Sequence, residues 1–246
     1  MTLADRFFCA RPIIFGRAPA AGTSLLNVNE FNQLQDMGAI FPTAFTLDVS
    51  SSSATDAAAG TGARTVEIAG LDFDGLPLLE TVTLNGQTVV TTTKAFWRVF
   101  GAQVLTVGTN RRNAGDIYIV KTGTGGTYTS GVPGTLTSAL IKILINENYG
   151  PSGFFTAPRG CQFKLEYWRQ GSRVQVGKHM IFKAAERTVP IMPATMLLSF
   201  DAPVGVAVRL EEAGNVFINE LEDIYFRCLM GAASGVASFS AAFGKV

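Results

Sequence analysis

Two neighbouring stretches decide what kind of fold this chain adopts: TGARTVEIAGLDFDG at residues 61–75 and ETVTLNGQTVVTTT at residues 80–93. Apolar and polar residues alternate in both stretches. Alternation with a period of two places the apolar side chains on one face of a β-strand and the polar ones on the other. The pattern therefore predicts a half-buried antiparallel sheet, in which the buried side chains are those of Val66, Ile68, Val82 and Leu84.

The same stretches contain turn signals. Asp74-Gly75 and Asn85-Gly86 are dipeptides that favour tight hairpin turns, so we expect two successive β-hairpins. The acidic residues of this segment also resemble the opening of a calcium loop, because alternating carboxylates can converge on one hard cation. Residues 76–78, however, are Leu-Pro-Leu and offer no side-chain oxygen for a cation. A hairpin turn is therefore the expected structure.

Strand patterns continue along the rest of the chain. From residue 45 onward they recur at a spacing, with turn signals, that is typical of a sandwich or barrel. The small polar residues 51–60 and the glycine-rich residues 123–134 lack apolar side chains for a strand and are expected to be loops. The expected strands lie near residues 45–50, 64–69, 79–84, 88–92, 96–107, 116–121, 139–146, 161–169, 173–183, 188–190, 196–201, 205–211, 223–230 and 235–243.

Several motifs in this part of the chain resemble those of a virion structural protein of marine tailed phages, short-tailed cyanophages included, with relatives in large algal viruses. The resemblance covers about residues 45–120 and rests on GTGARTVEIAGLD at residues 60–72, ETVTLNG at 80–86, the threonines at 91–93, the aromatic strand at 96–105 and NAGDI at 113–117. Further on, FFTAPRG at residues 154–160 resembles the aromatic-x-V-P-x-G-K turn of such proteins, and departs from it at Arg159 and Cys161.

The N-terminal residues 1–42 differ from the rest of the chain. Their apolar side chains are interrupted by prolines and show no sustained period, although residues 24–37 could hold one short helix. We therefore expect an N-terminal extended arm over residues 1–42 and a β-sandwich domain over residues 43–246, with a subdivision near residues 123–134 as an alternative. The arm must bury its apolar cluster against its own sandwich or a neighbour, and the candidate interface residues are Phe7, Phe8, Ile13, Ile14 and Phe15.

The composition indicates association with other protein chains. Charged residues make up only 16% of the sequence, against about 25% in ordinary soluble domains, while hydrophobic residues make up 47% and include 18 Phe. Such a chain is expected to cover apolar surface by self-association, and we expect a homotrimer. The net charge of +1 offers no basic surface for nucleic acid. No stretch approaches the roughly 20 apolar residues of a membrane helix, and the N-terminus lacks the order of a signal peptide.

Catalytic and metal sites are not expected. His179 is the single histidine, no nucleophile motif accompanies it, and the three cysteines have no metal spacing. The acidic residues at 211–212 and 220–223 lie beside expected turns, which argues against a glycosidase. Trp97 and Trp168 have strand neighbours and are expected in a core or subunit interface. The pair Arg111-Arg112 is expected at a solvated loop tip.

Together these observations predict an all-β, antiparallel jelly-roll-like β-sandwich that is not an enzyme and needs no cofactor. The resemblance implies a viral structural protein of the virion, assembled in the host cytoplasm. The predicted role is a capsid decoration or cement protein that binds the major capsid protein or other virion proteins and stabilises the head shell. The alternatives are a head-fibre, collar or tail component, or a receptor- or carbohydrate-binding β-sandwich module.

Overall fold

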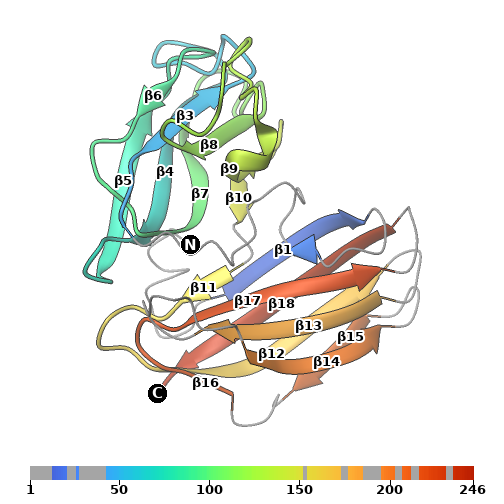
Figure 1. Ribbon diagram of the computed structural model, residues 1–246. Coiled ribbons are helices and arrows are strands. Elements are labelled where there is room, and N and C mark those ends of the chain that lie inside the picture. Colours follow the sequence, from blue (N-terminus) through green and yellow to red (C-terminus); the bar gives the residue numbers. More distant parts are fainter. Residues whose placement is uncertain are drawn as a thin grey trace.

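The chain folds into two β-sandwich lobes (Figure 1). The computed structural model describes residues 13–20, 26–27, 43–151, 154–172, 177–184, 195–202, 207–211, 216–230 and 235–246. Within these residues the regular structure is antiparallel strand, apart from the short 3₁₀ helix η1 (Leu136–Ser138). The expected fold class, an all-β antiparallel sandwich, is therefore confirmed.

The first lobe consists of two four-stranded sheets. One has the strand order β6-β3-β8-β9 and the other the order β10-β7-β4-β5. Its strands are β3 (Leu47–Ser51), β4 (Ala63–Leu71), β5 (Pro77–Thr83), β6 (Val90–Thr91), β7 (Arg98–Val107), β8 (Ile117–Lys121), β9 (Ala139–Ile143) and β10 (Tyr149–Pro151).

The second lobe contains the strands on either side of the first lobe in the sequence. Its two sheets have the orders β1-β18-β12-β15 and β11-β17-β13-β14, and the short strands β16 and β2 pair with β12 and β17. Its strands are β1 (Ile13–Ala20), β2 (Leu26–Asn27), β11 (Phe154–Thr156), β12 (Phe163–Ser172), β13 (Gly177–Ala184), β14 (Thr195–Ala202), β15 (Ala207–Glu211), β16 (Phe217–Ile218), β17 (Asp223–Met230) and β18 (Gly235–Lys245).

The pairing in the second lobe is that of a jelly roll. Its eight main strands form nested antiparallel pairs: the first with the last (β1 and β18), the second with the seventh (β11 and β17), the third with the sixth (β12 and β15), and the fourth with the fifth (β13 and β14). This is one long hairpin rolled into two facing sheets, as in double-sheet viral capsid and lectin domains. The first lobe is an insertion between the first and second strands of this roll.

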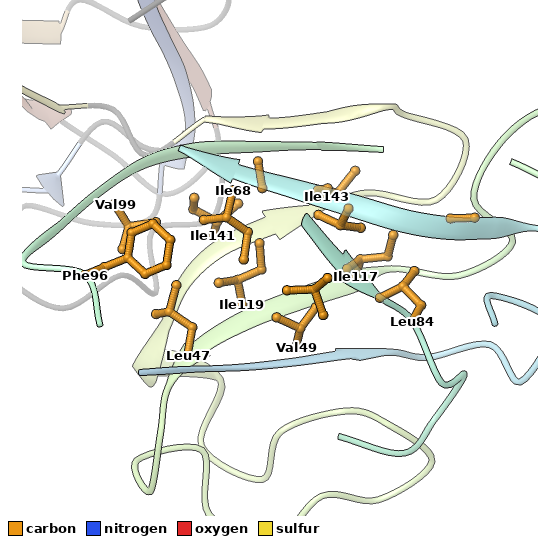
Figure 2. Close-up of a cluster of buried hydrophobic side chains, with 14 residues drawn as sticks. Leu47, Val49, Ile68, Leu84, Phe96, Val99, Ile117, Ile119, Ile141 and Ile143 are labelled. Atoms are coloured by element: carbon orange, nitrogen blue, oxygen red, sulfur yellow. The ribbon is translucent and has the colours of Figure 1, made fainter. Parts of the chain in front are cut away.

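The core of the first lobe lies between its two sheets. Apolar side chains from β3, β8 and β9 face those from β4, β5 and β7, and Figure 2 shows them meeting in the middle. This arrangement follows directly from the period of two, because every second side chain of each strand points inward. The members of this core that are fully buried include Leu47, Val49, Val66, Ile68, Phe96, Ile117, Ile119, Ile141 and Ile143.

The first expected hairpin is confirmed in register and in burial. Strand β4 pairs with β5, and Val66 lies opposite Val82. The four side chains expected inside are at most 4% exposed, whereas Thr83 is exposed and Glu67 is half-buried. Gly75 in the turn has φ +78°, which glycine adopts without steric cost, and its amide donates to the carbonyl of Asp72 at 3.1 Å.

The second expected hairpin is wrong. The turn after β5 is present, since the amide of Thr88 donates to the carbonyl of Asn85 at 3.1 Å. Strand β6 then crosses to the opposite sheet and pairs with β3. The Thr91 hydroxyl donates to Asp48 Oδ1 there at 2.8 Å. The turn therefore joins the two layers of the sandwich, and the local pattern could not show which sheet the next strand would join.

The glycine-rich loop at residues 123–134 covers the outer face of β8. Tyr118 and Val120 point away from the main core and yet are buried, because Val132 and Leu136 pack over them. The Ser50 hydroxyl donates to the carbonyl of Gly131 at 2.8 Å. Burial raises the pKa of the Tyr128 phenol to about 12, and the carboxylate of Asp48 adds to the shift. The loop is therefore a packed part of the first lobe.

The domain boundaries differ from those expected. Strand β1 falls within the expected arm, yet it pairs along its whole length with β18 and opens the jelly roll. Strand β2 lies where a short helix was an alternative, and pairs with β17. The loop at residues 123–134 lies inside the first lobe, and the chain passes to the second lobe between β10 and β11. Proline and glycine in a short apolar segment obscured a strand whose partner is more than 200 residues away.

Deleting residues 1–20 is expected to destabilise the jelly-roll lobe, because the deletion removes its first strand and leaves one edge of β18 without its partner. Deleting residues 1–12 is the matched control, because it leaves β1 in place. We expect the longer deletion to lower the melting temperature by several degrees more than the shorter one, measured by circular dichroism. Equal melting temperatures for the two variants would contradict the pairing of β1 with β18.

Candidate functional site

Buried polar and aromatic contacts lie together where the two lobes meet. At their centre Arg98, the first residue of β7, forms an ion pair with Asp223, the first residue of β17. Arg98 Nε donates to Asp223 Oδ1 at 3.0 Å and Nη2 donates to Oδ2 at 2.9 Å. Both residues are at most 4% exposed. A two-point contact of this kind fixes orientation as well as distance.

The remaining hydrogen-bonding groups of this ion pair also have partners. Arg98 Nη1 donates to the carbonyl of Trp97 at 3.1 Å, and the guanidinium lies 3.8 Å from the centre of the Trp97 ring. The hydroxyl of Thr156, on β11, donates to Asp223 Oδ1. A buried ion pair is tolerated only when such additional contacts compensate for the lost hydration. Strands from three parts of the sequence therefore meet at one carboxylate.

An aromatic cluster continues the joint beside the ion pair. Phe155 on β11 is fully buried, and three other phenylalanine rings surround it. Its ring centre lies 5.6 Å from that of Phe100 on β7, 5.2 Å from that of Phe163 on β12, and 5.2 Å from that of Phe243 on β18. Rings at these separations attract one another beyond simple burial. Phe100 belongs to the first lobe and the other three to the second.

The β4–β5 hairpin tip forms a third contact between the lobes, and Figure 1 shows this hairpin reaching toward the jelly roll. The amide of Arg159 donates to the carbonyl of Gly75 at 2.9 Å. Glycine is favoured at position 75, because φ is +78° and a Cβ atom would lie 2.2 Å from Leu221 Cδ2. Asp72 Oδ1 accepts the amides of Asp74 and Leu76, both at 2.9 Å. This carboxylate stabilises the hairpin turn that the sequence predicted.

A second buried carboxylate organises the far end of the first lobe. Asp56 is fully buried in the loop at residues 51–60. Its Oδ1 accepts the amides of Ala63 at 2.7 Å and Ala114 at 2.8 Å, and its Oδ2 accepts the Ser51 hydroxyl at 2.6 Å and the amide of Gly115 at 2.9 Å. Asp56 therefore anchors this loop of small polar residues.

The Asp56 contacts give a structural role to two of the motifs that resemble phage virion proteins. Three of its partners belong to the GTGAR and NAGDI motifs. A Cβ atom on Gly62 would lie 2.0 Å from Asp56 Oδ1, and one on Gly115 would lie 2.6 Å from both Ser52 Oγ and Ser53 N. The motif residues are thus needed to let three loops approach one carboxylate. Their role in this structure is architectural.

The five candidate interface residues are only partly described. Phe7 and Phe8 lie outside the described residues. Ile13, Ile14 and Phe15 lie on β1, where their backbones pair with residues 240–242 of β18. Their backbone pairing is thus within the same chain, and their part in contacts with another chain stays a prediction.

The other candidates from the sequence have local or structural contacts where the structure describes them. Glu220 and Glu222 accept local backbone amides, from Gly160 and Asn219. Trp97 is buried at the joint, as expected of a core residue. The side chains of His179 and Trp168 lie outside the described set. Among described residues, no three His, Cys, Asp or Glu side chains group as metal ligands, and no helix is long and apolar enough to cross a membrane.

Comparison with known proteins gives structural likenesses only. The chain matches no known family model and no curated protein sequence. Among solved structures it is similar to chains of infectious bursal disease virus: the Gx strain structure, at 10% identity and a TM-score of 0.26, and the T13 viral particle, at 8% identity and a TM-score of 0.25. The match covers 96% of this chain and 71% and 69% of those chains. At these TM-scores and identities the likeness assigns neither family nor function.

Breaking the joint ion pair from one side should be strongly destabilising. Asp223→Ala leaves the Arg98 guanidinium buried without its counter-ion, which typically costs about 3–5 kcal/mol. The double variant Arg98→Met with Asp223→Leu removes both charges and should recover much of this loss. Urea unfolding measures both. If Asp223→Ala costs less than about 1 kcal/mol, the ion pair does not hold the lobes together.

Removing the Asp56 carboxylate should also be costly. Asp56→Ala leaves three backbone amides without their acceptor, and each buried unsatisfied group costs about 1–3 kcal/mol, so a total loss above about 3 kcal/mol is expected. Asp74→Ala is the matched control, because its side chain is exposed at a hairpin tip. The free energy of unfolding in urea distinguishes the two, and similar losses for both would contradict an anchoring role.

Proposed function

We propose that this protein is a structural component of a virion, and more specifically a decoration or cement protein of a phage head. The observation that carries the proposal is the set of motifs between about residues 45 and 120 that resembles virion proteins of marine tailed phages. In the structure two of these motifs, GTGAR and NAGDI, supply backbone amides to the Asp56 anchor. A resemblance in residues that determine the fold supports a common architecture.

The physical character of the chain supports a role in assembly. The buried carboxylates of Asp56 and Asp223 are fully used by structural hydrogen bonds, and the lobes meet through an ion pair and an aromatic cluster. A two-lobed body held in this way can transmit load between neighbours without a mobile active site. The low charge and high apolar content favour self-association, for which we propose a symmetric trimer.

The proposed partners are further copies of this chain and the major capsid protein. Residues 1–12 contain Phe7 and Phe8 and precede the first strand of the jelly roll, so they are well placed in the sequence to reach a neighbour. Burial of a large apolar side chain contributes about 1.5–3 kcal/mol, and a trimer would repeat each such contact three times. A head-fibre, collar or tail component could associate through the same apolar contacts.

The test uses purified full-length protein and head shells of the encoding virus that were assembled without it. We expect a trimer by sedimentation, and decorated shells, by electron microscopy, that resist heating better than bare ones. The variant lacking residues 1–12 should keep its melting temperature and lose binding to shells. A stable monomer that leaves the shells undecorated would overturn the proposal. Binding only to fibres or tails would favour the alternative positions.

A further inference from the structure

A polar hollow lies at the end of the first lobe that points away from the jelly roll. Strand β7 starts at the joint with Arg98 and runs for ten residues, which is about 30 Å of extended chain. The hollow, of about 360 Å³, lies beyond its far end, between the β7–β8 and β9–β10 loops. It is lined by Asn110, Arg112, Asn113, Ala114, Ile145 and Asn146.

Asn113 in the wall of this hollow has an incomplete set of hydrogen bonds. It is fully buried, and its Nδ2 donates to the carbonyls of Gly115 at 2.8 Å and Leu144 at 2.7 Å. Because both partners are carbonyl oxygens, these two bonds identify the nitrogen and therefore the oxygen of the side-chain amide. Its Oδ1 is buried and has no hydrogen-bond partner among the described residues. Such an orphaned acceptor costs about 1–3 kcal/mol unless a donor reaches it.

A cationic group lies at the same hollow. Arg112 is exposed, and within the described part of the chain its guanidinium makes no hydrogen bond or ion pair. The exposed amide residues Asn110 and Asn146 flank it, and Ile145 adds an apolar surface that is 49% exposed. The hollow thus combines a positive charge, amide groups, one unsatisfied acceptor and a small apolar area.

We propose that this hollow binds a carboxylated sugar unit. Its carboxylate would pair with the planar guanidinium of Arg112, which suits a carboxylate. A sugar hydroxyl would donate to Asn113 Oδ1, other hydroxyls would bond the flanking amides, and the C–H face of the ring would lie on Ile145. A sulfate carries no hydrogen-bond donor for Asn113 Oδ1, and an apolar ligand would leave the Arg112 guanidinium without a counter-ion and Asn113 Oδ1 without a donor.

The position of the hollow is consistent with recognition at an exposed surface. Loops at the end of a β-sandwich are where such folds place binding residues. If the jelly roll faces the particle, the hollow faces outward, where polysaccharide of a host surface is accessible. The binding inference goes beyond the assembly role and does not depend on it, because binding is measured on the isolated protein.

The test is saturation-transfer NMR and calorimetric titration of the full-length protein with glucuronate and galacturonate, and with glucose and galactose as neutral counterparts. Acidic sugars should bind at millimolar concentration and neutral sugars at least about tenfold more weakly. Arg112→Gln should weaken binding of the acidic sugars about tenfold or more. Arg111→Gln is the matched control, because Arg111 is the neighbouring exposed cation outside the hollow, and it should bind like the wild type.

Asn146→Gly provides a second variant. Asn146 has φ +67°, a conformation that glycine adopts without strain, so the change removes the amide and keeps the loop. It should weaken binding severalfold while the melting temperature stays unchanged. The proposal is overturned if no acidic sugar binds, if neutral sugars bind equally well, or if Arg111→Gln and Arg112→Gln reduce binding equally, which would indicate unspecific attraction to positive charge.

Discussion

The ion pair between Arg98 and Asp223 is the contact on which the arrangement of the whole molecule depends. The two residues are 125 positions apart, and each is the first residue of its strand. Because both charges are buried, they are tolerated only in the geometry that satisfies the guanidinium and the carboxylate together. Trp97 covers the guanidinium and Thr156 completes the carboxylate. The lobes therefore have one well-defined way of meeting, and the aromatic cluster around Phe155 adds apolar burial to it.

The order of the strands along the chain explains why a firm contact between the lobes is needed. The first lobe interrupts the jelly roll between its first two strands, so β1 and β11 are separated by an entire sandwich. Their partners β18 and β17 come from the end of the chain. Strand β11 forms one edge of its sheet, next to β17. An ion pair that links β7 to β17, with β11 beside it, holds that edge in place.

The buried carboxylates of Asp56 and Asp223 have structural roles, whereas the polar hollow has polar groups available to bind a ligand. At Asp56 and Asp223 each carboxylate oxygen has partners, which is the usual condition of buried polar groups. At Asn113 one oxygen has none among the described residues. The satisfied and the unsatisfied groups are close neighbours in the sequence. The amides of Ala114 and Gly115 donate to the Asp56 carboxylate, whereas Asn113 lines the hollow. The same loop therefore fixes the fold on one side and presents unsatisfied groups on the other.

Local patterns in the sequence were sufficient for individual elements. The alternation around Val66 and Ile68 predicted the first hairpin, its register and its buried face, and most strands after residue 45 lie close to their expected positions. This works because a period of two and an Asp-Gly turn are properties of adjacent residues. The exposure of Arg111 and Arg112 was predictable for the same reason.

Pairing between distant segments was decided only by the tertiary structure. The sequence by itself did not show that β6 joins β3, that β1 joins β18, or that Arg98 meets Asp223, because each depends on which strand lies alongside which. Asp56 lay in a stretch of small polar residues, and its four bonds come from three separate segments. Alternation determines which face of a strand is buried, whereas the partner of a strand is determined by the packing of the whole chain.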